Sequence, residues 1–295
     1  MTGAGGYIGS NLARHICGTG AEVHVLLRPS TQLLLISDLK DKINVHRYAG
    51  ETSEIIEIVH SVRPDTIFHL AACFKAQHEP HEIKELIESN ILLGTQLLEA
   101  AAAEGVKCFI NTGTHWQNYD TCEYCPSDLY AATKQALETI ADYYISAFGI
   151  SFVTLKLIDT YGPFDPRPKL IPALKMAAQS DQRLDMSPGE QQIGLVYIDD
   201  VVKAFVLAAL YAEKMPPGTK KSFIAAPKEI YTLREVSAIF ENALGKKLNI
   251  EFGRHPYRKR EVMDICCGDE NILLKTELVG LYEGLQKVFK AECEI

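Results

Sequence analysis

The apolar residues of this chain fall into short runs that alternate with longer, amphipathic segments. The runs have the length and composition of buried strands and lie at Glu22–Leu27, Ile43–Tyr48, Thr66–Leu70, Lys107–Asn111 and Ser151–Leu157, with a late one at Lys221–Ala225. The segments between them have helical periodicity, at Asn11–Cys17, Glu54–Val62, Ile83–Glu104 and Tyr130–Phe148. This alternation predicts a parallel sheet covered by helices on both faces.

The alternation of strands and long helices ends after residue 160, where Pro163, Pro166 and Pro168 stiffen a loop. Shorter, mixed elements follow: a helix at Ile171–Ala178, a turn at Pro188–Gly189, a strand at Leu195–Ile198, a helix capped by Asp199 or Asp200, and a strand at Leu248–Phe252. We expect a doubly wound α/β (Rossmann) domain from residues 1–160 plus about 195–226. A smaller mixed α/β substrate lobe, about 161–194 and 227–295, is expected to close over the carboxyl ends of the sheet.

Three glycines at three-residue spacing, Gly3, Gly6 and Gly9, open the chain ahead of the first helix. They predict a tight turn that lets the backbone approach a pyrophosphate and aims a helix N-terminus at it. Such a turn follows a buried central strand, but only Met1 and Thr2 precede Gly3. We therefore expect the first β-strand to be missing because the sequence is truncated at its start, for example by a wrongly assigned initiator. An intact mass of the native protein matching residues 1–295 would refute this.

The composition of the chain limits the classes of function that it can have. A net charge of −8 and a pI near 5.6 argue against nucleic-acid binding through a general basic surface. No apolar stretch approaches the roughly 18 residues of a membrane span, and no signal peptide is visible. The eight scattered cysteines favour a reducing, cytoplasmic compartment with free thiols. The lone Cys122-Glu-Tyr-Cys125 motif lacks the second ligand pair that zinc needs, so we expect no metal site.

Tyr130 and Lys134 lie four residues apart and share one face of the predicted helix. Thr114 follows the strand Lys107–Asn111, so a hydroxyl, a phenol and an ammonium are expected to meet at the end of the sheet. Free tyrosine has a pKa of about 10, and a neighbouring ammonium and an oxidised nicotinamide would both favour its phenolate. Taken alone, the same spacing also fits an ordinary amphipathic helix with a surface tyrosine and lysine.

The order of these parts resembles the extended short-chain dehydrogenase/reductase family, in particular its nucleotide-sugar branch. The resemblance covers almost the whole chain and is carried by Thr2–Gly9, His69–Ala72, Asn90–Thr95, Thr114, Tyr130 with Lys134, Tyr161–Pro163 and Val196–Asp200. It implies that Tyr130 exchanges the proton at the sugar oxygen, that Lys134 binds the nicotinamide ribose and tunes Tyr130, and that Thr114 hydrogen-bonds the same oxygen. It also implies cofactor contacts at Gly3, Gly6, Tyr7, Ile8, Gly9, Ala71 and Asn90, and a homodimer formed through helices 83–104 and 130–148.

The end of the second expected strand bears on the choice of nicotinamide cofactor. Enzymes that prefer NAD place an Asp or Glu there, about 20 residues beyond the glycines, to bind the ribose hydroxyls. This chain has Arg28, followed by Ser30 and Thr31, and no carboxylate. A guanidinium suits a 2′-phosphate, so we favour NADP(H) and keep NAD(H) as possible. The alternative is a solvated arginine at a strand end.

The substrate contacts depart from the resembled family. Its nucleotide-sugar branch often carries an arginine where this chain has Ile193-Gly194. Arg167, Lys169 and Arg258 are candidate replacements for binding a diphosphate, although each could be a surface charge. His115 follows Thr114 and could either shape the sugar pocket or pack.

Three further segments, Asp165–Leu170, Ser187–Gln191 and Phe252–Arg258, are similar to bacterial reductases that make CDP-3,6-dideoxyhexoses, the abequose and paratose synthases. This resemblance implies NADPH-dependent reduction of the 4-keto group of a CDP-4-keto-3,6-dideoxy sugar for surface polysaccharide, with no nucleic-acid or membrane partner. The alternatives are an NAD-dependent nucleotide-sugar 4-epimerase, a non-catalytic NADP-binding sensor and a truncated, inactive homologue. A sensor would have no need of Thr114, Tyr130 and Lys134 together.

Overall fold

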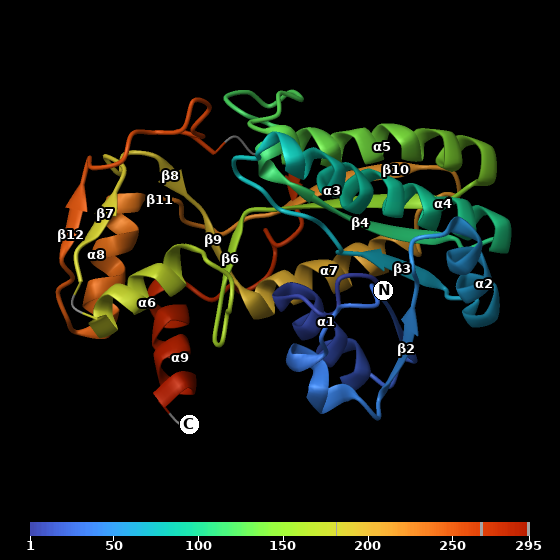
Figure 1. The fold of residues 1–295 in the computed structure, drawn as a ribbon, viewed down its shortest axis with the longest axis horizontal. Coiled ribbons are helices and arrows are strands. Elements are labelled where there is room, and N and C mark those ends of the chain that lie inside the picture. Colours follow the sequence, from blue (N-terminus) through green and yellow to red (C-terminus); the bar gives the residue numbers. More distant parts are fainter. Residues whose placement is uncertain (181, 266–267, 294–295) are drawn as a thin grey trace.

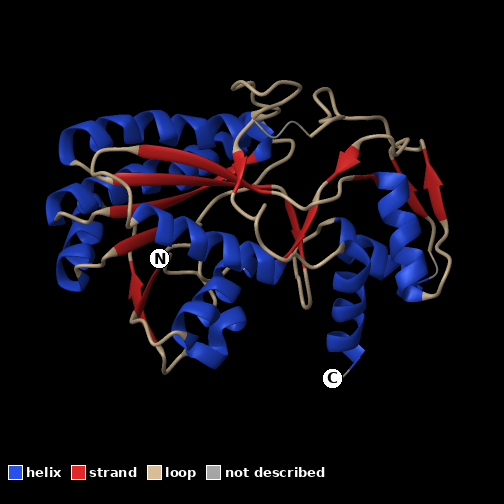
Figure 2. Cartoon of the chain, turned by 180° about the vertical axis from the view of Figure 1, so that it is seen from behind, coloured by secondary structure: helices blue, strands red, loops and turns tan. Residues whose placement is uncertain are grey.

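The structure is a computed structural model and describes residues 1–180, 182–265 and 268–293. Its body is a parallel sheet with helices on both faces (Figures 1 and 2). Five strands pair in the order β13-β10-β5-β4-β3, and β1 pairs with β2. Their bounds are β1 Val23–Leu27, β2 Ile43–Arg47, β3 Thr66–His69, β4 Cys108–Thr114, β5 Ser151–Leu157, β10 Lys220–Ala225 and β13 Glu270–Asn271.

Helices pack on the two faces of this sheet. They are α1 (Tyr7–Gly18), α2 (Thr52–Val62), α3 (Ile83–Ile87), α4 (Leu93–Glu104), α5 (Leu129–Phe148) and α7 (Ile198–Ala212), with single turns η1 (Leu34–Leu39), η2 (Pro80–Glu82), η3 (Glu88–Leu92) and η4 (His115–Gln117). Side chains of α2, α4 and α5 form one core with the sheet, and side chains of α1 and α7 form another on the opposite face. The prediction of a doubly wound α/β fold is confirmed.

One residue stands where a central strand is expected. Thr2 bridges in parallel to Leu26 of β1 on one side and to His69 of β3 on the other. The two sides of the sheet are therefore joined across its middle through the two bridges of this one residue.

A second group of elements lies at the other end of the molecule (Figure 1). It comprises α6 (Leu170–Ser180), β7 (Leu184–Met186), β8 (Gln192–Ile193), β11 (Tyr231–Thr232), α8 (Leu233–Leu244), β12 (Ile250–Phe252) and α9 (Leu281–Cys293), and the pair β6 (Asp159–Tyr161) and β9 (Leu195–Tyr197) joins it to the body. Its core is built around Leu174, Phe240 and Leu285. β13 does not join this group and instead pairs with β10 at the edge of the large sheet. The division into two domains stays a prediction.

Three local expectations need correction. Ile83–Glu104 is not one regular helix, because the π-helical turn η3 separates α3 from α4. Tyr197, and not Asp199 or Asp200, is the N-cap residue of α7, and both aspartates lie in its first turn. Cys122 is disulfide-bonded, although Cys125 of the same motif is free as expected. Within the described residues, no helix is long and apolar enough to cross a membrane.

Candidate active site

The glycine loop is tightly closed between the first helix and the end of β3. Gly3 has a φ of +75°, and a Cβ there would lie 2.7 Å from the backbone of Leu70 and Ala71. A Cβ at Gly9 would collide with the Gly3 carbonyl. Gly6 is the N-cap of α1, which has no side-chain cap and no acidic residue in its first turn. The helix therefore presents free N–H groups and the positive end of its dipole, as a phosphate site requires.

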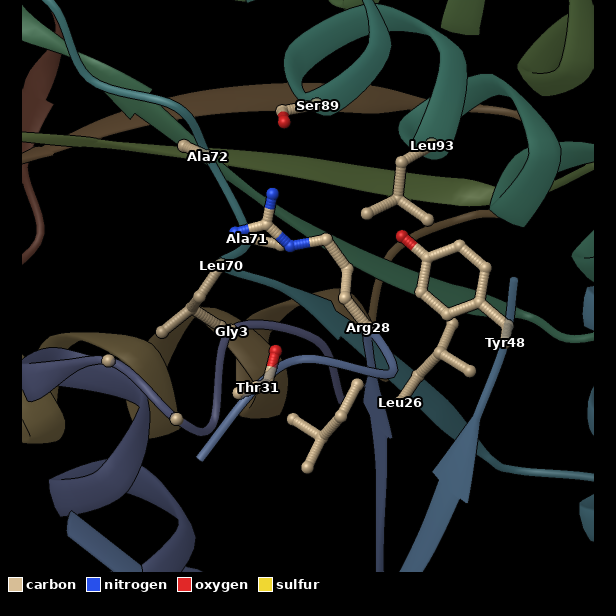
Figure 3. A pocket seen from close by; sticks show the side chains of 13 residues that line it. Gly3, Leu26, Arg28, Thr31, Tyr48, Leu70, Ala71, Ala72, Ser89 and Leu93 are labelled. Atoms are coloured by element: carbon tan, nitrogen blue, oxygen red, sulfur yellow. The ribbon is translucent and has the colours of Figure 1, made fainter. Parts of the chain in front are cut away.

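A cavity of about 310 Å³ opens above this loop (Figure 3). It is lined by Gly3, Gly5, Gly6, Leu26, Leu27, Arg28, Thr31, Tyr48, Leu70, Ala71, Ala72, Ser89 and Leu93. Four predicted cofactor residues, Gly3, Gly6, Arg28 and Ala71, meet here. Tyr7 and Ile8 do not line it; the Tyr7 hydroxyl donates to Pro163 O at 3.0 Å, and Ile8 packs against two hydrophobic cores.

Arg28 extends across this cavity from the end of β1 toward Ala71 (Figure 3). Its side chain is well exposed, and its nearest carboxylate oxygen, on Glu85, lies 4.0 Å away. Arg47 holds the following loop, donating to the carbonyls of Arg28, Pro29 and Thr31 at 2.8–3.3 Å. Sequence reasoning missed Arg47 and Tyr48 because β2 carried no motif. The available signal was that β2 ends on a cationic residue, Arg47.

Tyr130 and Lys134 lie on one face of α5, as the spacing predicts. The Lys134 Nζ is 5.9 Å from the centroid of the Tyr130 ring. The Lys134 side chain is fully buried, and its Nζ has no hydrogen-bond partner among the described residues. Burying an ammonium that has no hydrogen-bond partner costs free energy. We therefore expect a bound ligand to supply an acceptor for the Lys134 Nζ.

Burial controls the protonation of both groups. It lowers the pKa of Lys134 to about 8, against an opposing contribution from Glu138. It raises the pKa of the Tyr130 phenol, and Asp128 adds to this effect. The sequence predicts that the Lys134 ammonium lowers the pKa of Tyr130, but Lys134 does not contribute to this shift. Tyr130 is thus held as the neutral phenol at neutral pH, the form that donates a proton.

Asn90 lies at the π-helical turn η3 and ties two parts of the site together. Its side chain donates to Cys73 O at 2.9 Å and to Thr133 Oγ1 at 3.0 Å, and its Oδ1 accepts from Cys73 N at 2.8 Å. Thr133 in turn donates to Tyr130 O at 2.7 Å. Asn90 therefore fixes the loop after β3 to the helix that carries Tyr130 and Lys134. π-Helical turns of this kind are frequent at functional sites.

Thr114 ends β4, and its Oγ1 accepts from Trp116 N at 3.3 Å as the cap of η4. His115 is buried, and its Nδ1 lies 3.2 Å from Leu157 O. Burial lowers the pKa of His115, so its ring is neutral. His69 is likewise buried, with its pKa lowered to about 3, and contacts Thr2 Oγ1 at 2.9 Å. Both histidines are held by the protein and neither is poised as a base.

A second cavity, of about 320 Å³, lies on the side of the smaller lobe. Its walls combine aromatic and charged side chains: Phe74, Ala76, Trp116, Asp159, Thr160, Tyr161, Pro168, Lys169, Leu170, Ile171, Pro172, Ala173, Ile193, Leu195 and Arg258. Lys169 lies 4.3 Å from the Phe74 ring and 3.1 Å from Asp159, and the Arg258 guanidinium lies 4.8 Å from the Trp116 ring. Lys169 and Arg258, both predicted substrate residues, are thus brought together.

Arg167 does not line this cavity. Its guanidinium donates to both carboxylate oxygens of Asp165 and to Thr160 O, at 2.7–2.9 Å, and stacks 4.8 Å from the Tyr7 ring. These contacts fasten the proline loop to the start of α1. Asp165, two residues earlier in the sequence, was a signal that the Arg167 guanidinium would be paired with a carboxylate.

The loop that follows β3 contributes to both cavities. Ala71 and Ala72 line the first cavity, whereas Phe74 and Ala76 line the second. The Phe74 ring lies 5.1 Å from Tyr130 and 5.5 Å from Trp116. The Tyr130 ring therefore packs against a lining residue of the second cavity, although Tyr130 itself lines neither cavity.

The residues present fit a dinucleotide. The glycine cradle would be filled by any Cβ at Gly3, the N-terminus of α1 is uncapped, and the buried Lys134 ammonium lacks a protein partner. Gly3 and Gly6 would hold the diphosphate, Arg28 the adenosine end and Lys134 the nicotinamide ribose. Among the described residues, no cluster of His, Cys, Asp or Glu could hold a metal ion.

The chain is similar to known proteins in its sequence and in its fold. Residues 1–221 match the model of the NAD dependent epimerase/dehydratase family. The chain is 27% identical to the CDP-abequose synthase of Salmonella muenchen, over 90% of this chain and 86% of that protein. Its fold superposes on the UDP-glucose 4-epimerase of Thermotoga maritima with a TM-score of 0.84 at 23% identity, covering 99% and 97% of the two chains. The UDP-N-acetylglucosamine 4-epimerase of Methanobrevibacter ruminantium M1 gives 0.84 at 18% identity, over the same shares. The chain therefore belongs to the NAD dependent epimerase/dehydratase family and is an enzyme of the extended short-chain dehydrogenase/reductase type.

Proposed function

We propose that this enzyme uses NADPH to reduce the 4-keto group of a nucleotide-linked deoxysugar of the CDP-4-keto-3,6-dideoxyhexose type. The observation that carries the proposal is the position of Tyr130, a phenol that shares one helix face with a buried ammonium and packs against Phe74 of the second cavity. When bound, a nicotinamide cofactor supplies hydride. The protein must then supply a proton to the carbonyl oxygen and hold the two reactants together.

Tyr130 is the proton donor in this proposal. Its raised pKa keeps the proton on the phenol until a developing alkoxide takes it. Thr114, at the end of β4, donates a hydrogen bond to the same oxygen. Lys134 holds the ribose next to the phenol and lends positive charge to the phenolate that remains. A reductase needs a proton donor at the carbonyl oxygen as hydride arrives, whereas an epimerase must first remove a proton from a sugar hydroxyl.

Arg28 supports NADPH as the reductant. It extends over the first cavity, where an NAD-specific site would have a carboxylate, and its ion pair with Glu85 is long, at 4.0 Å. An arginine can bind a 2′-phosphate through two parallel hydrogen bonds.

The substrate is proposed from the second cavity and from the relatives. Lys169, which pairs with Asp159, and Arg258, which pairs with Glu261, are the proposed ligands of a diphosphate, while Phe74 and Trp116 offer apolar rings to a deoxysugar or a base. Three CDP-abequose synthases are 24–27% identical over 89–92% of this chain. We therefore place a CDP-linked 4-ketosugar in this cavity.

A homodimer is part of the proposal. The outer faces of α3, η3 and α5 carry the exposed apolar side chains Ile83, Ile87, Leu92, Tyr143 and Phe148. These helices lie on the same face of the sheet (Figure 1). A second copy of the chain packed on them would cover this apolar surface.

The test is a panel of CDP-, dTDP- and GDP-linked 4-ketosugars, each offered with NADPH and with NADH. We expect the fastest net oxidation of NADPH with the CDP-4-keto-3,6-dideoxy sugar. A purified protein that retains NAD and interconverts two 4-hydroxy sugars without net cofactor turnover would be an epimerase, and the proposal would be wrong.

A further inference from the structure

The side-chain amide of Gln117 links the end of β4 to α5. Gln117 is the last residue of η4, and its side chain is fully buried. Its Oε1 accepts from Thr114 N at 2.9 Å. Its Nε2 donates to Gln135 Oε1 at 2.8 Å and to Glu138 Oε1 at 2.7 Å, and both of these residues lie on α5. One side chain therefore joins the strand end that carries Thr114 to the helix that packs over it.

The orientation of this amide follows from its partners. A backbone N–H only donates, so the atom that faces Thr114 N is the amide oxygen. The amide nitrogen then places its two N–H groups on two oxygen acceptors, one on Gln135 and one on Glu138. A buried amide bonded in this way is held in one position, because breaking any of these bonds leaves a buried polar atom unpaired.

Gly113 leaves the space that this amide needs. A Cβ at position 113 would lie 2.8 Å from Gln117 Oε1 and 2.8 Å from Thr154 Cγ2 on β5. A side chain at this position would displace one of the two residues. Gln117 therefore packs directly on the backbone of β4, next to Thr114.

The hydroxyl of Thr114 is oriented by the same turn. Its Oγ1 accepts from Trp116 N at 3.3 Å, which leaves its O–H available as a donor. In the proposed function this O–H donates to the sugar oxygen that receives a proton from Tyr130. The two groups lie on different elements and must converge on one atom. A misplacement of about 1 Å can lower a rate about 10²-fold, so a rigid link between the two elements has a direct effect on turnover.

We propose that Gln117 is a positioning residue that holds the Thr114 hydroxyl at a fixed place relative to the Tyr130 phenol. Its bond to Thr114 N fixes the end of β4, and its bonds to Gln135 and Glu138 tie that end to the helix of Tyr130. Gln117 itself lines neither cavity of the active site. Because Thr114 donates to the sugar oxygen only in the proposed function, this role of Gln117 rests on that function.

The first test is Gln117→Met, which keeps the length of the side chain and removes its three hydrogen bonds. We expect kcat to fall at least tenfold, while the dissociation constant for NADPH changes less than about threefold. Gln96→Met is the matched control, because Gln96 is also a buried glutamine and donates to Gly50 O and Thr52 Oγ1. Its kcat should be unchanged. An unaltered kcat in Gln117→Met, or an equal loss in both variants, would overturn the proposal.

A double-mutant cycle with Thr114→Val tests whether Gln117 acts through Thr114. Once the hydroxyl is gone, adding Gln117→Met should lower kcat less than about twofold further. A second loss as large as that of Gln117→Met alone would contradict the proposal. The cycle also separates the two claims. A normal kcat in Thr114→Val would refute the role of Thr114 in the reaction, whereas a loss in Thr114→Val with none in Gln117→Met would refute only the role of Gln117.

Amide hydrogen exchange gives a readout that does not depend on turnover. Thr114 N donates to the Gln117 side chain, so its exchange measured by NMR should be at least tenfold faster in Gln117→Met than in the unmodified enzyme. Exchange of Thr114 N should be unchanged in Gln96→Met. An equally slow exchange in Gln117→Met would show that Gln117 does not hold the end of β4, and the proposal would be wrong.

Discussion

The Lys134 ammonium lies 5.9 Å from the centre of the Tyr130 ring, one turn further along the same buried face of α5. The two side chains share one environment, and burial moves their pKa values in opposite directions, each toward the neutral form. The pair is therefore set to donate a proton and not to take one.

Tyr130→Phe should lower kcat by at least two orders of magnitude, because general acid catalysis contributes about 10²–10⁴-fold and the proposed reaction assigns it to this phenol. NADPH affinity should change less than about threefold, since the ring remains. Steady-state kinetics and a fluorescence titration measure the two effects. Tyr124→Phe, on an exposed loop, is the matched control and should behave as the unmodified enzyme. Near-normal turnover of Tyr130→Phe would remove this residue from the reaction.

Lys134→Met should inactivate the enzyme and stabilise it at the same time. Burial lowers the pKa of Lys134 from 10.5 to about 8, so the folded state binds this proton more weakly than the unfolded state does. The cost is on the order of 3 kcal/mol and is fully present below pH 8. It is lost as the pH rises toward 10.5, where both states are neutral. Removing the ammonium removes the cost.

Urea unfolding of both proteins between pH 7 and pH 10 measures this difference. The stability advantage of Lys134→Met should be largest near pH 7 and shrink steadily above pH 8. An advantage that grows with pH would show that the ammonium is stabilised in the fold, contrary to this account.

Arg28→Glu should exchange the cofactor preference. A lost bidentate contact to a phosphate and a new like-charge repulsion should weaken NADPH binding at least tenfold, while NADH binding is retained or improved. Dissociation constants for both nucleotides, measured on the same protein, provide an internal control. If the binding of NADPH and of NADH were weakened equally, Arg28 would support the shape of the cavity without binding the 2′-phosphate.

Arg258→Ala should raise KM for the nucleotide sugar about tenfold or more and change kcat less, because the guanidinium lines the second cavity, where the substrate is proposed to bind. Arg254→Ala, four residues earlier and paired with Glu251 at the surface, is the control and should leave KM unchanged. A fall in kcat with KM unaltered would place Arg258 in the chemical step.

Tyr143→Glu should convert a dimer into a monomer in sedimentation experiments, because it puts a charge in the centre of the exposed apolar surface of α5. Met176→Glu, at a similarly exposed position on α6, should not. A protein that is monomeric without either substitution would exclude this interface.

The sequence was most informative where periodicity and short motifs determine structure. The alternation of strands and helices, the glycine loop and the shared face of Tyr130 and Lys134 were all predictable because they depend on local spacing. The π-helical turn at Asn90 was not, because one extra residue per turn leaves the apolar pattern almost intact. The stacking of Arg167 on Tyr7 joins residues 160 positions apart, and no local pattern reports such a pair. The same holds for Arg47, whose role is set by β1 pairing with β2.

The most direct measurement follows the hydride itself. NADPH deuterated at C4 of the nicotinamide is incubated with the enzyme and CDP-4-keto-3,6-dideoxyglucose, and the product is analysed by mass spectrometry and NMR. We expect one deuterium at C4 of the sugar from one of the two cofactor stereoisomers and none from the other, with one NADPH consumed per alcohol formed. An alcohol without deuterium from either stereoisomer, or a ketosugar left unreduced, would contradict the central claim.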